Sequence, residues 1–145
     1  MWIYGGAYVI GSKDDIYLVP TGLFRATKKP MIFVALNYRQ RSIALHRFEG
    51  NSHITSRLGA FGWSAPPSEK SVVPNLGLYD AKAALEWIRD YIPRFGGNAA
   101  DVTVFGESAG GGVIMHLITA YGGLRDPLAF QKVSSVKFLW MSFIS

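Results

Sequence analysis

The chain has 145 residues, 49% hydrophobic and 17% charged, which predicts a single globular domain and excludes a disordered segment. It has no cysteine, so disulfides, Cys-type zinc sites and thiol nucleophiles are excluded. No apolar run reaches the ~18–20 residues that a membrane-spanning helix needs, and the first residues lack the basic and apolar parts of a secretory signal. Composition therefore favours an α/β domain without a membrane span and leaves the localisation unknown.

The net charge of +5 and the pI of about 9.6 raise the possibility of a nucleic-acid binder. However, four of the five excess positive charges lie in residues 40–57 and 124–145. No basic helix face with interleaved aromatic residues is present. Scattered surface charge is therefore the favoured interpretation, and no nucleic-acid partner is expected.

The first half of the chain predicts two strands. Residues 2–4 are the end of a buried strand that runs into Gly5 and Gly6, and residues 31–38 are apolar and rich in strand formers, as in a central parallel strand. Residues 11–29 between them contain glycine, proline and charge. They predict a crossover loop with a short helical turn.

The second half predicts a helix, a strand and another helix. In residues 75–92, apolar side chains recur at helical spacing, Asn75 is a candidate N-cap and Pro93 ends the helix. Residues 102–105 form a short strand, and residues 109–121 form a second helix that closes on two glycines. The apolar face of the first helix consists of Leu78, Ala81, Leu85 and Ile88. This order of elements predicts a parallel sheet with crossover helices.

Residues 106–110, Gly-Glu-Ser-Ala-Gly, match the nucleophile-elbow pattern Gly-x-Ser-x-Gly. In this pattern the serine lies on a tight turn between strand and helix, and the glycines avoid collisions that side chains would cause. The predicted strand before Ser108 and the predicted helix after it supply the required context. Ser108 is therefore a candidate nucleophile, and the backbone N–H of Ala109 is a candidate oxyanion donor.

Gly5, Gly6 and Ala7 follow the first predicted strand and could supply further oxyanion donors, because small residues let the backbone approach a substrate. A glycine pair after a strand is by itself usually only a turn. The elbow elsewhere in the chain gives the pair its functional interpretation.

Together these segments resemble the type-B carboxylesterases and lipases, the cholinesterase-like branch of the α/β-hydrolases. The likeness covers most of residues 1–39 and 58–132 in the order of the family. The matching segments are residues 2–8 (WIYGGAY), 11–12, 34–39 (VALNYR), 58–63 (LGAFGW), 75–80 (NLGLYD), 84–88 (ALEWI), 95–97 and 102–111. The resemblance implies a partial α/β-hydrolase fold, with the three predicted strands side by side at the centre of the sheet.

The resemblance also implies site residues and a reaction. Ser108 would be the nucleophile, and Gly6, Ala7 and Ala109 would donate to the oxyanion. Glu107 would either tune the site electrostatically or bond to the entry of the helix. The reaction would be hydrolysis of a carboxylic ester through an acyl-enzyme, without metal or cofactor.

The triad acid and base are not found in this sequence. After Ser108 the chain has one acid, Asp126, and one histidine, His116, which at ~1.5 Å per residue lies roughly 12 Å along the helix from the serine. A base must lie within ~2.6–3.2 Å of the serine hydroxyl. His46 and His53 are interpreted as loop residues. We therefore expect a truncated esterase, inactive alone, in a family whose intact members are often secreted.

Two stretches depart from the family pattern. Residues 40–57 separate segments that are continuous in the family, and the likeness fades after Lys132. We expect both 40–57 and 133–145 to be non-family segments of translated intron, with a surface loop as the alternative for 40–57. The aromatic residues Trp63, Trp87, Phe138 and Trp140 are interpreted as core or exposed former core.

The alternative function is a non-catalytic interaction protein of the same fold, like the adhesion members of the family. The intact elbow around Ser108 argues against it, because such a protein needs no nucleophile. A nucleic-acid binder rests on net charge alone and is the weakest hypothesis.

Overall fold

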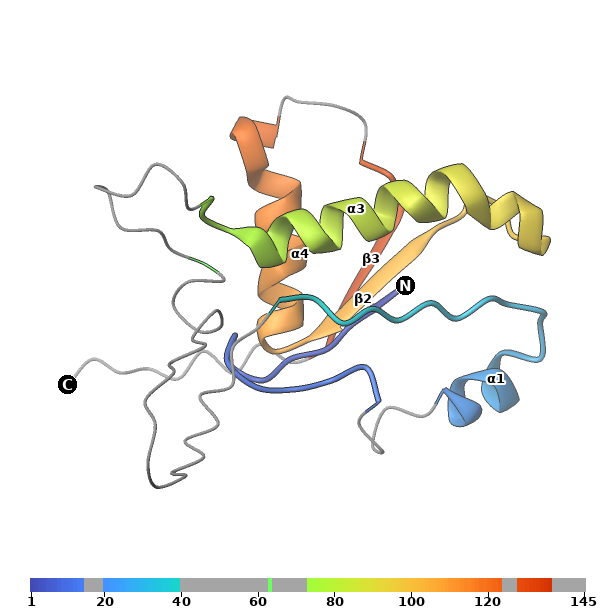
Figure 1. Cartoon of the computed structure of the whole chain (residues 1–145). Coiled ribbons are helices and arrows are strands. Elements are labelled where there is room, and N and C mark those ends of the chain that lie inside the picture. Colours follow the sequence, from blue (N-terminus) through green and yellow to red (C-terminus); the bar gives the residue numbers. More distant parts are fainter. Residues whose placement is uncertain (15–19, 40–62, 64–72, 124–127, 137–145) are drawn as a thin grey trace, which may run out of the picture.

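The computed structural model describes residues 1–14, 20–39, 63, 73–123 and 128–136. Within them, three strands form one sheet in the order β1-β2-β3, with every pair parallel. The strands are β1 (Trp2–Ile3), β2 (Thr103–Glu107) and β3 (Lys132–Val136). The helices are α1 (Thr21–Thr27), α3 (Leu76–Tyr91) and α4 (Ala109–Thr119), with 3₁₀ turns η2 (Ile92–Phe95) and η3 (Ala120–Gly123). This is the predicted parallel α/β architecture (Figure 1).

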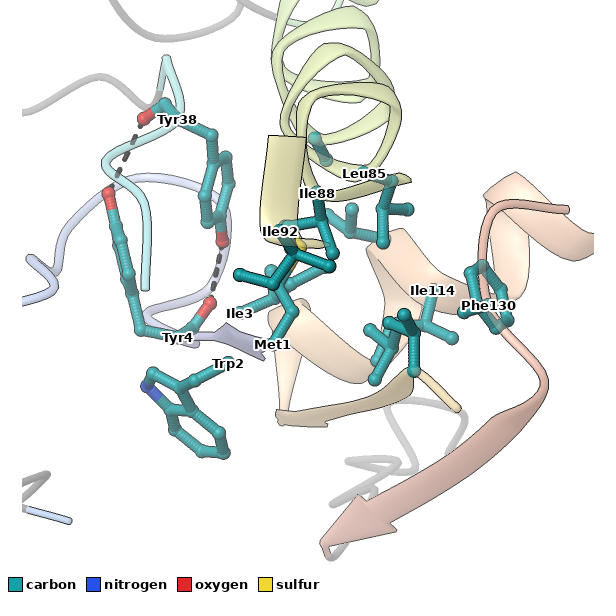
Figure 2. Packing of buried hydrophobic residues seen from close by; sticks show 14 residues of the cluster. Met1, Trp2, Ile3, Tyr4, Tyr38, Leu85, Ile88, Ile92, Ile114 and Phe130 are labelled. Carbon is teal, nitrogen blue, oxygen red and sulfur yellow. Dashed lines mark hydrogen bonds between the residues drawn. The ribbon is translucent and has the colours of Figure 1, made fainter. Parts of the chain in front are cut away.

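The apolar core lies between the sheet and the helices α3 and α4. Ile3 of β1, Val104 of β2 and Val113 of α4 are fully buried there. From α3, the predicted residues Ala81, Leu85 and Ile88 face this core, while Leu78 is half-buried. Figure 2 shows Leu85 and Ile88 of α3 together with Ile3 of β1 in this core. The helical spacing read from the sequence therefore identified the buried face of α3.

The other face of the sheet carries aromatic side chains. Trp2 of β1 packs on Phe105 of β2 with ring centroids 4.9 Å apart, and Phe33 packs on the same Phe105 ring at 5.8 Å. Phe24 of α1 contacts Phe33 at 6.5 Å, so α1 is joined to this face. The short helical turn expected in the first crossover is thus α1.

The segment 31–38 is not a regular strand, contrary to the prediction. Only Ala35 forms a bridge, with Trp2, and the Trp2 N–H donates to the Val34 carbonyl at 2.7 Å. β1 has two residues, so it offers too short a ladder for eight residues to pair with. The segment still lies next to β1, on the side away from β2, which confirms that the three predicted strands are neighbours.

The strand β3 was not predicted. Its residues pair with β2 from Thr103↔Lys132 to Glu107↔Val136, and the Lys132 ammonium contacts the Asp101 carboxylate at 2.6 Å. Residues 133–136 of the expected non-family tail therefore belong to the sheet. Residues 40–57, the expected insertion, and residues 137–145 lie outside the described residues.

Asn75 occupies the N-cap position of α3, as predicted, but its side chain makes no capping bond. Its backbone has φ 60°, and its carbonyl accepts the N–H of Leu78 at 2.9 Å. An ion pair with Arg39, rather than a side-chain cap, holds the start of α3 in place. The Arg39 guanidinium donates to both carboxylate oxygens of Asp80, at 2.6 and 2.7 Å. Burial raises the pKa of Asp80, but the hydrogen bonds from Arg39 outweigh it and lower this pKa below its usual value.

In a polypeptide that begins at Met1, the free amino group of this residue should make stability depend on pH. It donates to the Thr103 carbonyl at 2.6 Å, and burial lowers its pKa from 8.0 to about 6. Between these values the unfolded chain binds more protons, so stability should rise with pH from 6 to 8, by about 2–3 kcal/mol. Urea unfolding of a polypeptide with a free Met1 amino group would measure this rise. An acetylated Met1 should abolish it; a rise of equal size after acetylation would contradict the assignment.

Candidate active site

Ser108 lies at the turn between β2 and α4, with φ 52° and ψ −118°. This backbone conformation is rarely adopted by a residue with a side chain, and it turns the strand sharply into the helix. The glycines on both sides make the turn possible. A Cβ on Gly106 would lie 2.7 Å from the Gly110 carbonyl carbon, and a Cβ on Gly110 would lie 2.7 Å from the Tyr4 carbonyl oxygen. The local geometry is that of a nucleophile elbow.

The side chain of Ser108 is not used to stabilise the helix. It holds the N-cap position of α4, where serine often bonds to a backbone N–H, yet it makes no capping bond. The N–H groups of Ala109, Gly110 and Gly111 have no acceptor within the helix, because the first N–H groups of any helix lack a preceding turn whose carbonyls could accept them. The hydroxyl therefore lies beside the positive end of the α4 dipole.

The loop after β1 lies directly against the elbow. A Cβ on Gly5 would lie 2.6 Å from the Glu107 carbonyl and 3.0 Å from the Ser108 Cβ, so only glycine allows this approach. Gly6 follows with φ 114° and Ala7 with φ 53°. Two residues far apart in sequence, Gly5 and Ser108, are thus brought into contact by the parallel pairing of β1 with β2.

Residues 6–10 form a tight turn, which we call the oxyanion turn. The Gly6 carbonyl accepts the N–H groups of Val9 at 2.9 Å and Ile10 at 3.0 Å. Ala7 and Tyr8 both have positive φ, 53° and 63°. The turn places Gly6 and Ala7, the predicted oxyanion donors, next in the chain after the glycine that contacts Ser108.

Glu107 is exposed and its carboxylate lies beside Gly5. Among the described residues this carboxylate makes no hydrogen bond to the start of α4, so one of the two sequence-based interpretations, the helix-entry bond, is not realised there. The position beside the glycine loop suits the other interpretation, electrostatic tuning of the site.

Of the remaining titratable candidates, only His116 lies in the part of the chain that the structure describes. His116 is exposed in the last turn of α4, two turns beyond the serine. Asp126, His46 and His53 lie outside the described residues. The part of the chain that the structure describes holds no cluster of His, Cys, Asp and Glu suited to a metal ion.

The sequence analysis missed the residues that support the oxyanion turn. Trp63 was interpreted as core or exposed former core, but its indole N–H donates to the Tyr8 carbonyl at 3.1 Å. Tyr38 donates its hydroxyl to the Tyr4 carbonyl at 2.7 Å, directly before Gly5 (Figure 2). Of the other aromatic residues, Trp87 is exposed, while Phe138 and Trp140 lie outside the described residues.

A hollow of about 300 Å³ lies away from the elbow, between α3 and the end of α4. Leu85 and Arg89 of α3, Leu117 of α4 and Phe130 line it. Ser108 is not among its lining residues, so the hollow does not adjoin the elbow.

The strand, elbow and helix, with a glycine loop beside the serine, define a partial α/β-hydrolase fold. Residues 53–128 match the model of the Carboxylesterase family. The chain belongs to the carboxylesterase family. Its fold agrees with a solved structure described as a thermophilic PNB esterase, with a TM-score of 0.67 and 35% identity over 91% of this chain and 23% of that one.

Curated relatives give the same assignment. A secreted lipase of Arthroderma benhamiae is 37% identical, over 92% of this chain and 24% of the relative. The carboxylesterase patB of Penicillium expansum is 39% identical, over 89% of this chain and 21% of the relative. The chain therefore spans about a quarter of the length of these relatives. None of the helices in the described part is long and apolar enough to span a membrane.

Proposed function

We propose that this chain supplies the nucleophile and the oxyanion donors for hydrolysis of a carboxylic ester. The Ser108 hydroxyl would attack the ester carbonyl carbon. The negatively charged former carbonyl oxygen of the tetrahedral intermediate would then accept hydrogen bonds from the N–H groups of Gly6, Ala7 and Ala109. The observation that carries the proposal is the contact of Gly5 with Ser108 at the strained elbow. It brings the oxyanion turn and the serine to one place.

The proposed reaction needs a histidine to take the serine proton and an acid to orient that histidine. The described residues provide neither near Ser108. We therefore propose that the described residues hold one half of the catalytic machinery. The histidine and the acid would have to come from polypeptide outside the described residues.

The nucleophile can be tested in a chimera. Residues 1–136 would replace the matching quarter of the PNB esterase, whose remaining sequence would supply the rest of the fold. We expect hydrolysis of a p-nitrophenyl ester, and its loss in the chimera with Ser108→Ala. Ser12→Ala is the matched control and should keep the activity. A folded chimera whose activity survives Ser108→Ala would refute the proposal.

The 145-residue polypeptide alone should show little or no turnover. A serine hydroxyl without a base is a poor nucleophile, although the oxyanion donors alone can still give some acceleration. Assay of a purified, monodisperse preparation with a short p-nitrophenyl ester would measure this. Turnover at an ordinary enzyme rate of ~1–10³ per second, abolished by Ser108→Ala, would contradict the expectation.

A further inference from the structure

Trp63 joins the oxyanion turn to another part of the fold. Its indole N–H donates to the Tyr8 carbonyl at 3.1 Å, and its ring meets the Tyr8 ring edge-on, with centroids 5.0 Å apart. The same indole meets the Tyr38 ring at 6.2 Å. The Trp63 indole therefore contacts the turn at two points, the Tyr8 carbonyl and the Tyr8 ring.

The other side of Trp63 is fixed to the start of α3. The N–H of Asn75 donates to the Trp63 carbonyl at 3.2 Å. The indole also lies flush against Gly77, where a Cβ would come within 2.8 Å of the ring. Gly77 is buried near the beginning of α3, and its lack of a side chain makes room for the indole. The helix thus provides a rigid base from which Trp63 reaches the turn.

The oxyanion turn needs such support because its own sequence does not favour its shape. Ala7 and Tyr8 both adopt left-handed backbone conformations, which cost free energy for residues other than glycine. The two hydrogen bonds to the Gly6 carbonyl hold the turn from inside, but residues in this conformation persist where the surroundings impose it. The bond from Trp63 to Tyr8 acts at the second of the two left-handed residues.

We infer that Trp63 is a positioning residue that holds the oxyanion turn in its left-handed conformation, so that the Gly6 and Ala7 N–H groups face the Ser108 site. The inference rests on the proposed function for the role of those two N–H groups. The conformation of the turn itself can be measured without any ester chemistry. Trp63 touches neither the substrate nor the serine in this account; it acts through the Tyr8 carbonyl.

Hydrogen exchange of single amides, followed by NMR on the full 145-residue chain, tests the inference. The amides of Val9 and Ile10 report the turn, and the amide of Phe105, which donates to the Met1 carbonyl at 3.0 Å, reports the sheet. In Trp63→Phe, which keeps a ring but removes the N–H, Val9 and Ile10 should exchange roughly three- to tenfold faster, as for loss of one hydrogen bond. Phe105 should be unchanged. Trp87→Phe, at an exposed tryptophan of α3, is the matched control and should change neither.

Gly77→Ala tests the same inference from the other side of the indole. Alanine favours the helix at this position, but its Cβ would lie 2.8 Å from the indole and 2.9 Å from the Arg39 carbonyl oxygen. Displacement of the indole should make the turn exchange faster, and the Phe105 amide reports whether the second contact loosens the sheet as well. This variant decides the question if Trp63→Phe fails to fold. Unchanged exchange at Val9 and Ile10 would overturn the inference, because Trp63 would then not hold the turn. An equal acceleration at Phe105 would also overturn it, because a merely structural role of Trp63 would affect all amides through global unfolding. An inactive chimera with a turn that depends on Trp63 would refute only the proposed function.

Discussion

Replacing Gly110 by alanine should destabilise the fold by about 3 kcal/mol or more. The added Cβ would overlap the Ile3 carbonyl oxygen and lie 2.7 Å from the Tyr4 carbonyl oxygen. Both atoms belong to the backbone around β1, so no side-chain rotation can relieve the contact. Overpacking typically costs ~1–3 kcal/mol where side chains can move, and a backbone obstacle places this change at or above the upper end. Urea unfolding monitored by circular dichroism would measure the loss.

Gly22→Ala provides the comparison for Gly110→Ala. Gly22 lies in α1, and a Cβ there would have nothing within 4 Å. Alanine should stabilise this helix by roughly 0.5–1 kcal/mol through its higher helix propensity. If Gly110→Ala proved as well tolerated as Gly22→Ala, the close packing of β1 against the start of α4 would be wrong.

Replacing Ile3 by alanine should cost about 2–5 kcal/mol. Ile3 is fully buried between the sheet and the helices, and removing its branched side chain leaves a cavity that the surrounding residues fill only in part. The free energy of unfolding in urea is again the measurement. Met115→Ala, at a half-exposed position of α4, should change this value by no more than about 0.5 kcal/mol. Equal effects of the two substitutions would show that Ile3 does not lie in the core.

The features that could be predicted from sequence are those that short-range patterns determine. The spacing of Ala81, Leu85 and Ile88 identified the buried face of α3, and the glycines around Ser108 identified the elbow. In both cases the residues that interact lie within a few positions of one another. The turn at Ser108 follows only in part from these few residues: Gly106 packs against Gly110, but Gly110 itself is required by the distant backbone of Ile3 and Tyr4.

The features that could not be predicted depend on contacts between distant segments. The segment 31–38 has the composition of a central strand, but the two residues of β1 limit its pairing to one bridge. β3 is a strand because β2 supplies its partners, although Lys132, Ser134 and Ser135 give it little strand character of its own. Trp63 supports a turn 55 residues earlier in the chain, and no local pattern indicates that contact.

The pairing of β1 with a strand late in the sequence has a consequence for how the chain folds. Trp2 pairs with Phe105, 103 positions further along, so the hydrogen bonds of β1 with β2 close a very long loop. Pairings at such separation slow folding, because the entropy of loop closure is lost before the contacts form. On a ribosome that adds ~5–20 residues per second, β1 would wait roughly 5–20 s before β2 is even synthesised. During that time the apolar residues of β1 lack their partners in β2. Chaperones that bind nascent chains would therefore act on this protein mainly in the interval before β2 is synthesised.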